Sequence, residues 1–250
     1  MIYVQQRSTR PSYVAIYCVL IVFIDFLIIS QYIDRGKEFA AKIQEVFDVN
    51  LYKIAWNEVL VGTKPSNEEV NELRKRYLRK NSNDILPLKD WYNPKVSTVG
   101  PLEGALLCQR TNLFWDKKLR EEVNKRVLVW TGLLSVIYVT ASVFQEATVE
   151  AFLIMAVIPI TPLALYAFRL VKGNGKSIKH LESLKIILDK AWSDASLNLL
   201  SEELLRKVQN EIFAHRKNNF PISDALYLRL KKKFEDDSKY NVEKMIDDLT

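Results

Sequence analysis

The residue with the most unusual surroundings is Asp25, the single charge in an apolar run from Ser12 to Ile33 that reads SYVAIYCVLIVFIDFLIISQYI. If this run crosses a membrane, an ionisable group in it costs about 2.5 to 3.5 kcal/mol and normally faces protein or water. Asp25 could line a cation pathway, which a ring of this residue from several subunits would make natural. Alternatively, it is protonated or satisfied by hydroxyl groups. The candidate hydroxyl side chains are Thr131, Ser135, Tyr138 and Thr140.

A second group that could do chemistry is a string of cations between Arg74 and Lys80, which follows a PSNEE motif. In this motif the Ser66 hydroxyl and the Glu69 carboxylate are placed to satisfy free amides at the start of a helix. The cations could contact lipid headgroups or a phosphorylated ligand, or they could form a solvated helix face. The candidate ligand contacts in the whole chain are Arg74, Arg76, Trp91 and Arg110.

Motifs for catalysis and cofactor binding are incomplete. The run GNGKS at 173–177 resembles the end of a phosphate-binding loop, but Leu170 stands where that motif needs a glycine, and an apolar segment precedes it instead of a strand. We therefore predict that this run ends a helix and forms a turn. His180 and His215 have no Cys, Asp or Glu at the spacing of a zinc site, and no nucleophile context is recognisable. The sequence predicts no catalytic residue, metal site or cofactor, and hence a protein that is not an enzyme.

Two prolines, Pro159 and Pro162, lie inside another apolar run. Proline has no amide N–H, so each one frees a helical carbonyl and bends the helix, and neighbouring groups or water must compensate. The bend is either a gating hinge or a static kink. Both prolines are therefore candidate gating residues, together with Asp25 as a candidate for the pore.

These residues are set among three apolar blocks, so the mean hydropathy of −0.07 averages over two different environments. Besides 12–33, the blocks are VLVWTGLLSVIYVTASVFQ at 127–145 and AFLIMAVIPITPLALYAF at 151–168, and neither holds a charge. Their lengths suit the roughly 20 residues that cross about 30 Å of hydrocarbon. The alternative for the last two blocks is a pair of buried helices in a soluble bundle. A secretory signal peptide fits 12–33 poorly, because no small-x-small cleavage site follows it.

The last two blocks must form an antiparallel hairpin, because only EATVE at 146–150 separates them. Cations are frequent just outside both ends of the hairpin, whereas its turn carries two glutamates and no cation. The positive-inside rule therefore places the turn outside and the flanking regions in the cytoplasm of a bacterial inner membrane. In order, we predict a tail at 1–11, a span at 12–33, a cytoplasmic region at 34–126, spans at 127–145 and 151–168 around an external turn at 146–150, and a cytoplasmic region at 169–250. Arg7 and Arg10 suit an outward tail badly, which hints that a preceding span is missing.

The cytoplasmic regions show helical periodicity and no convincing strand pattern, so the predicted fold class is all-α. Apolar residues at Phe39, Ile43, Val46 and Phe47 predict a stalk that continues the first span. Prolines and glycines make 86–104 an ordered loop, in which Trp91 is more suited to anchoring against a core or the membrane interface than to stacking on a ligand. The tail is predicted to form three or four amphipathic helices. Their apolar positions are Ile178, Leu181, Leu184, Leu188 and Trp192, then Leu204, Leu205, Val208 and Ile212, then Leu226, Leu230 and Phe234.

The net charge indicates the kind of partner, and the positions of the cysteines bear on whether a disulfide forms. The net charge of +6 comes mostly from segments that flank the apolar blocks, where it would face anionic lipid of the inner leaflet. Nucleic acid is the less favoured partner for this excess. Cys18 lies in an apolar block and Cys108 in a cytoplasmic interval, so a structural disulfide is not expected.

Several polar motifs in register resemble the SMODS- and SLOG-associating four-transmembrane effectors of bacterial anti-phage defence. They are AAKIQEVFDVNLYKIAWN (40–57), GTKPSNEEV (62–70), DWYNP (90–94), CQRTNLFWDKKLR (108–120) and EIFAHRKNNFPISDALYLRL (211–230). The likeness covers roughly residues 35 to 235, with the hairpin at the expected place. One departure is that the family usually has two spans before its first cytoplasmic segment, whereas this chain shows one.

The resemblance implies an effector that stays silent until a cyclic nucleotide signal, linked to a partner nucleotidyltransferase, activates membrane disruption. Three spans in one subunit cannot enclose a wide aqueous pathway, so a pore would need a homo-oligomer in the lipid bilayer. The alternative is a membrane-anchored adaptor, whose cytoplasmic helices recruit a soluble partner. The resemblance assigns no catalytic or ligand-contacting residue.

Overall fold

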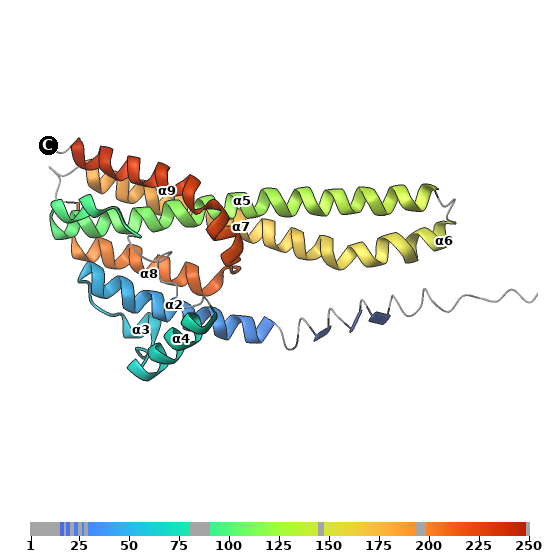
Figure 1. Cartoon of the computed structure of the whole chain (residues 1–250), viewed down its shortest axis with the longest axis horizontal. Helices are drawn as coiled ribbons and strands as arrows, with labels where there is room; N and C mark the ends of the chain where they lie inside the picture. The colour runs from blue at the N-terminus through green and yellow to red at the C-terminus, as the bar shows by residue number, and fades with distance from the viewer. Residues whose placement is uncertain are drawn as a thin grey trace, which may run out of the picture. The chain divides into compact units, whose positions relative to one another are not determined.

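The computed structural model describes residues 16, 17, 19, 20, 23, 24, 27, 30–80, 91–144, 148–193 and 199–248. These residues form helices and no strand, which confirms the predicted all-α class for the described part of the chain (Figure 1). Asp25 and Cys18 lie outside the described residues, so what was predicted for Asp25 stays a prediction.

From Ser30 onward, the described residues form six longer helices and four short helical segments. The longer helices are α2 (Ser30–Tyr52), α4 (Asn67–Lys80), α5 (Pro101–Phe144), α7 (Ile158–Ser193), α8 (Glu202–Asn218) and α9 (Asp224–Asp247). The short segments are α3 (Glu58–Val61), η3 (Pro94–Thr98), α6 (Val149–Phe152) and η4 (Leu153–Val157).

The chain divides into two compact units. Unit 1 comprises Met1–Arg35 and Glu122–Gly175, and unit 2 comprises Gly36–Glu121 and Lys176–Thr250. Three helices, α2, α5 and α7, each continue from one unit into the other without interruption. Each of these three helices thus links an apolar block to unit 2.

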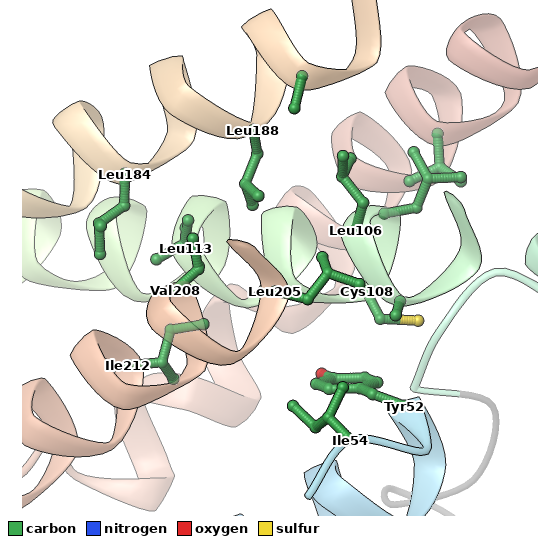
Figure 2. Close-up of a cluster of buried hydrophobic side chains, with 14 of the residues drawn as sticks. Tyr52, Ile54, Leu106, Cys108, Leu113, Leu184, Leu188, Leu205, Val208 and Ile212 are labelled. Atoms are coloured by element: carbon green, nitrogen blue, oxygen red, sulfur yellow. The ribbon is translucent and has the colours of Figure 1, made fainter. Parts of the chain in front are cut away.

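Unit 2 has its own hydrophobic core, to which α2, α5, α7, α8 and α9 all contribute (Figure 2). The apolar residues of α7 and α8 recur at spacings of three and four, so each helix turns one stripe toward this core. Leu181, Leu184 and Leu188 are buried on α7, and Leu205, Val208 and Ile212 are buried on α8. The predicted apolar faces of these tail helices are therefore confirmed.

The helix predicted from the PSNEE motif is α4. The Ser66 N–H donates to a Glu69 carboxylate oxygen at 2.8 Å, and the Glu69 N–H donates to the Ser66 hydroxyl at 3.2 Å. This reciprocal capping box fixes where the helix begins, as predicted. The helix is described as far as Lys80, after which residues 81–90 lie outside the described part of the chain.

The predicted helical stalk is confirmed as the helix α2, and the face that it buries includes two carboxylates. Phe47 is 56% exposed, whereas Glu45 and Asp48 are 0% and 2% exposed. The local pattern does not reveal these buried carboxylates, because their cationic and amide partners lie far away in the sequence.

Unit 1 exposes apolar side chains. Among the described helices, Pro101–Phe144 is long and apolar enough to cross a membrane, with an 18-residue window of mean hydropathy 2.0 and none of that window buried. Hydroxyl groups on this helix bond to carbonyls of their own helix: Ser135 donates to the Thr131 carbonyl at 2.8 Å and Ser142 to the Tyr138 carbonyl at 2.9 Å. These two hydroxyls are thus satisfied within the helix itself.

The second half of unit 1 is a succession of α6, η4 and α7. At η4 the helix is wider, since the Ile158 N–H donates to the Leu153 carbonyl five residues back. Pro162 lies inside α7, one turn further on, and Pro159 is its second residue. The structure thus places both prolines beside a π-turn, a common feature at irregular points of helices.

The run GNGKS does not end a helix, because α7 continues through it to Ser193. The predicted helix stop and turn at 173–177 are therefore wrong. Asn174 is buried and donates to the Asn124 amide oxygen of α5 at 2.9 Å, so packing in unit 1 supports the helix at the point where its propensity is low.

Candidate functional site

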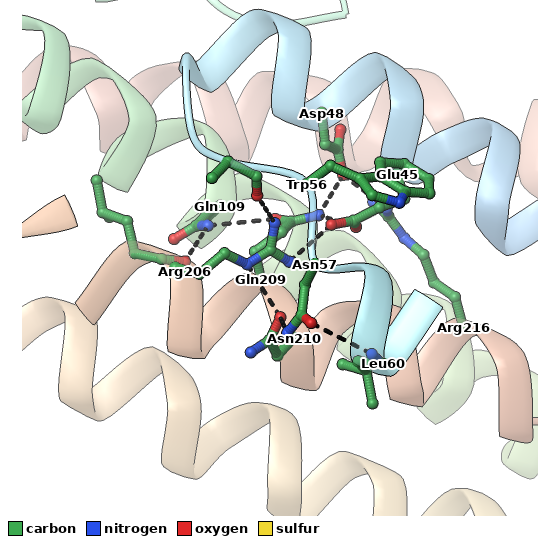
Figure 3. Close-up of polar contacts among 12 residues, drawn as sticks. Glu45, Asp48, Trp56, Asn57, Leu60, Gln109, Arg206, Gln209, Asn210 and Arg216 are labelled. Atoms are coloured by element: carbon green, nitrogen blue, oxygen red, sulfur yellow. Dashed lines mark hydrogen bonds and ion pairs between the residues drawn. The ribbon is translucent and has the colours of Figure 1, made fainter. Parts of the chain in front are cut away.

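The candidate site is a group of buried polar side chains in unit 2, which we call the carboxylate core. It joins helices that run into the apolar segments to a helix, α8, that lies wholly in unit 2. Figure 3 shows the side chains of α2 directed toward α8. Its members are Glu45 and Asp48 on α2, Gln109 on α5, and Arg206, Gln209 and Arg216 on α8.

Each carboxylate of α2 has a cationic partner on α8. Arg206 Nη2 lies 2.7 Å from a Glu45 oxygen, and Arg216 Nη1 lies 2.6 Å from Asp48 Oδ2. Burial disfavours the Arg216 charge, but the adjacent Asp48 outweighs this effect and raises the pKa of Arg216 above its ordinary value. Arg216 therefore keeps its positive charge beside Asp48 at physiological pH.

Gln209 bridges the two carboxylates. Its Nε2 group donates to Glu45 Oε2 at 2.8 Å and to Asp48 Oδ2 at 3.0 Å. Gln109 of α5 donates to the Gln209 side-chain oxygen at 3.2 Å and to the Leu205 carbonyl at 2.9 Å. The core thereby ties α2, α5 and α8 together through charge-assisted and amide hydrogen bonds.

The end of α2 is held by a further set of bonds to α8. Arg206 Nη1 donates to the Ala55 carbonyl at 2.8 Å, and its Nε donates to Asn210 at 2.9 Å. Asn57 also donates to Asn210 at 3.1 Å and caps α3 through the Leu60 N–H. The segment that follows α2 is consequently bonded to α8 at two positions, Ala55 and Asn57.

Buried ion pairs of this kind favour one packing arrangement of the helices over alternative arrangements, and they add little net stability. Bringing the charges out of water is costly, and removing a single partner leaves an uncompensated charge at a cost of about 3 to 5 kcal/mol. The core contains carboxylates, guanidinium groups and amides, and no nucleophile. It can hold or release the register of α2 against α8, but it does not resemble a catalytic site.

A second polar cluster surrounds the phenol groups of Tyr52 and Tyr92. Their oxygens are 2.7 Å apart, and Asn112 Nδ2 lies 3.0 Å from each. Burial raises the pKa of both phenols far above the ordinary value. Burial, together with Asp48, also raises the pKa of the Cys108 thiol to about 12. These groups are neutral structural contacts and not proton-transfer groups.

A third cluster contains Asp116, His215, Asn219 and Ser177. His215 bonds to Asp116 through Nε2 and to the Asn219 side-chain N–H group through Nδ1, and the Ser177 hydroxyl donates to Asn219. Burial opposes ionisation of Asp116, but the His215 bond and the Arg120 charge outweigh it and lower its pKa. Asn219 stands between the hydroxyl and the imidazole, and an amide cannot act as a base. The cluster is therefore not a nucleophile–base pair.

An open hollow of about 270 Å³ lies beside this third cluster, between α7 and α8. Lys176 and His180 line one side of it, and Glu211 lies opposite. His180 Nε2 is 3.1 Å from the Glu211 carboxylate. Within the described residues, no group of three His, Cys, Asp or Glu side chains could hold a metal ion.

The predicted ligand contacts occupy three separate environments. Arg74 and Arg76 are exposed on α4. Trp91 packs against Trp115 and Tyr227, with ring centroids 5.3 and 5.7 Å away. The structure therefore gives Trp91 the anchoring position against a core that its loop suggested.

Arg110 is buried and faces α7. Its Nε lies 2.5 Å from Asp189 Oδ1, and Lys185 Nζ lies 2.6 Å from the other oxygen of the same carboxylate. Burial opposes ionisation of Asp189, but these two cations outweigh it and lower its pKa. Arg110 could contact a ligand only after giving up this internal partner.

Sequence reasoning missed the carboxylate core, although a signal for it is present. Glu45, Asp48 and Tyr52 stand at spacings of three and four, which places them on one face of α2. Arg206, Gln209 and Arg216 occur among the apolar residues of α8 in a comparable way. Polar residues on an apolar helical face indicate a buried polar contact, provided that both helices show the pattern.

Comparison with known proteins gives one family match. A profile of the SMODS-associating 4TM effector domain matches residues 1–245. A protein of Bacillus cereus (strain VD146), named as a probable CBASS effector molecule, is 29% identical over 213 residues, which are 83% of this chain and 67% of that protein. No solved structure matches the chain.

Proposed function

Because the chain belongs to the family of SMODS-associating 4TM effector domains, we propose that it is the membrane effector of a CBASS anti-phage system. In this proposal a cyclic nucleotide, made by a partner nucleotidyltransferase, causes the effector to open or disrupt the bacterial inner membrane. The chain itself performs no catalytic step and needs no cofactor.

The membrane part of the proposal is supported by the surface of unit 1. Leu128, Val129 and Trp130 are exposed, as are Val143 and Phe144 near the other end of the same apolar stretch. An exposed apolar surface of this length, with internally satisfied hydroxyls, suits hydrocarbon and not water. The cations at both ends of the hairpin support a cytoplasmic location for unit 2.

One observation carries the proposed mechanism: α2, α5 and α7 run unbroken between the apolar segments and unit 2, where the carboxylate core ties α2 to α8. A ligand that binds unit 2 can shift a closed population toward an open one only if its affinity differs between the two. A rearrangement at the carboxylate core supplies such a difference, because its bonds favour one register of α2. Several copies must assemble to enclose a pathway.

The contacts proposed for the nucleotide are Arg74, Arg76, Trp91 and Arg110. The guanidinium of Arg110 would exchange Asp189 for a ligand phosphate, and the ring of Trp91 would exchange protein contacts for a base. Both exchanges alter packing within unit 2. Pro159, Pro162 and Asp25 are the proposed gating and pore residues.

Cells that express the chain with its cognate nucleotidyltransferase should lose membrane potential and become permeable to ions. An inactive nucleotidyltransferase with the same effector serves as the control and should leave both unchanged. If membrane potential and permeability stay normal while the signal is made, the pore-forming proposal fails.

A second candidate function is a membrane-anchored adaptor, which the separate hydrophobic core of unit 2 favours, since that core does not depend on unit 1. Replacing the three apolar segments by unrelated apolar helices of equal length distinguishes the two functions. An adaptor should still recruit its partner and protect the cell, whereas a pore-former should lose activity.

A further inference from the structure

The open hollow between α7 and α8 is lined by residues of unit 2 and by none of the contacts proposed for the nucleotide. Its floor is fixed by the bonds that join Ser177, Asn219 and His215, and the Ser177 and His215 side chains are buried. Its volume of about 270 Å³ lies just below the range of about 300 to 1,000 Å³ that most ligand pockets occupy. A preformed hollow of this size suits a small ligand.

The two ends of the hollow carry different groups. At one end, His180 Nε2 lies 3.1 Å from the Glu211 carboxylate. Together with the bonds of the floor, this contact makes α7 and α8 antiparallel here, so Lys176 and Asn218 share the other end. At about 1.5 Å of rise per residue, the ends are about 6 to 11 Å apart along the two helices. Within the described part of the chain, the Lys176 ammonium and the Asn218 amide have no hydrogen-bond or ion-pair partner.

The charges around the hollow nearly balance. Lys176 contributes a cation and Glu211 an anion. Beneath the floor, Asp116 is paired with Arg120 at 3.2 Å and is bonded to His215. A ligand with only an anionic group would meet the Glu211 carboxylate as well as the Lys176 ammonium. The ligand that suits both ends therefore carries an anionic group at one end and N–H donors at the other.

Lys176 and Ser177 are also the last two residues of the GNGKS run, which resembles the end of a phosphate-binding loop. Because α7 continues through this run, helical hydrogen bonds occupy its backbone amides, which cannot surround a phosphate as those of a loop do. The Lys176 side chain nevertheless lines the hollow. A phosphate contact at this run therefore comes from a side chain and not from the backbone.

We propose that the hollow binds a nucleoside phosphate, at a site separate from the contacts proposed for the nucleotide signal. The Lys176 ammonium and the Asn218 amide hold the phosphate through hydrogen bonds. At the other end, Glu211 exchanges His180 for N–H groups of the base, and the released imidazole packs on the base ring. The His180 and Glu211 side chains are 45% and 53% exposed, so this exchange breaks no buried contact. The site does not depend on the membrane role of unit 1.

The test is a calorimetric titration of the full chain, purified in detergent, with guanosine monophosphate, because guanine presents two adjacent N–H donors to a carboxylate. Lys176→Gln should weaken binding about ten-fold, since it removes a charge-assisted hydrogen bond. Glu211→Gln should weaken it by a similar factor. Inorganic phosphate separates the two ends: its binding should weaken in Lys176→Gln and should not weaken in Glu211→Gln, where a repelling carboxylate is gone.

Two control variants make the same charge changes away from the hollow. Lys179→Gln and Glu202→Gln alter exposed positions of α7 and α8 that do not line it, and both should bind guanosine monophosphate like the unmodified chain. The absence of binding at millimolar ligand would overturn the inference. Equal affinities of the hollow variants and the controls would do the same.

Binding that Arg74→Gln/Arg76→Gln abolishes and Lys176→Gln leaves intact would also overturn the inference, because the ligand would then contact α4. The membrane potential of cells is a separate measurement. A chain that binds guanosine monophosphate in the hollow but never depolarises cells retains the inference and loses the proposed function. A chain that depolarises cells and does not bind it has the opposite outcome.

Discussion

The two units place polar and apolar groups in opposite ways. In unit 2 the interior holds charged and amide side chains such as Glu45, Asp48 and Gln209, each provided with partners. In unit 1 many large apolar side chains are exposed, such as Val129 and Val136, and the Ser135 hydroxyl bonds to its own helix. One helix, α5, belongs to both patterns: its first part is buried and its last part is exposed. The difference indicates that the two units are built for two solvents.

The largest expected effect comes from leaving a charge of the carboxylate core without its partner. Asp48→Ala removes the carboxylate that faces Arg216 and should lower the free energy of unfolding by about 3 to 5 kcal/mol, measured by denaturation of the purified chain in detergent. Asp48→Leu/Arg216→Met should recover most of this loss, since neither member of this ion pair is then left as an unpaired charge. Glu203→Ala, which breaks the exposed pair with Lys207 on α8, is the control and should leave the midpoint unchanged.

A charge on the exposed surface of unit 1 is expected to have the next largest effect. Val136→Arg should weaken membrane insertion by about 2.5 to 3.5 kcal/mol, measured as the fraction extracted from membranes by alkaline carbonate. Ile186→Arg is the matched control, since Ile186 in unit 2 is 58% exposed and Val136 is 62% exposed. The control should stay in the membrane fraction like the unmodified chain. Equal tolerance of both substitutions would show that the two surfaces face the same solvent.

The Asp116–His215 contact allows a pH test of unit 2. The pKa of Asp116 lies below its ordinary value of 3.8, so its stabilisation is present above that pH and is lost as the pH falls through the native pKa. Asp116→Asn should cost about 1.5 to 3 kcal/mol at neutral pH and flatten the loss of stability below about pH 4. Thermal melts between neutral and acid pH measure both. A variant with the same steep acid profile as the unmodified chain would contradict this role, and Asp237→Asn, at an exposed position of α9, provides the comparison.

The smallest effect concerns the junction of the units in α7. Gly175 lies inside a helix, and a Cβ there would meet no atom within 4 Å, so Gly175→Ala should stabilise the chain by about 0.5 to 1 kcal/mol. Gly62 has a positive φ of 78°, and Gly62→Ala should destabilise it instead. Denaturation midpoints of the two variants should move in opposite directions. Destabilisation by Gly175→Ala would mean that the helix ends there after all.

Local patterns predicted the elements well wherever one face of a helix is apolar. The leucines of α7 and α8 and the capping box of α4 required only spacing and side-chain type. At GNGKS the prediction failed because helix propensity is a weak signal that tertiary contacts override, here the Asn124–Asn174 bond.

The candidate site was harder to predict, because its bonds join residues far apart in sequence. Glu45 and Arg206 are 161 positions apart, and Arg110 and Asp189 are 79 apart. A single sequence shows the types of such residues but not their pairing. Arg110 therefore looked available for a ligand although an internal carboxylate occupies it, and Glu45 and Asp48 were not singled out as buried residues.

The wide turn at η4 has a consequence for the rotational phase of the helix that follows it. A π-turn contains one residue more than an α-helical turn, so it rotates everything after it by about 100° relative to an uninterrupted helix. Removing one residue between Leu153 and Val157 would restore the α-helical phase and turn a different stripe of α7 toward any given neighbour. The two prolines just beyond it remove two amide N–H groups from the helical ladder. The one extra residue at η4 therefore determines which side of α7 faces each of its neighbours.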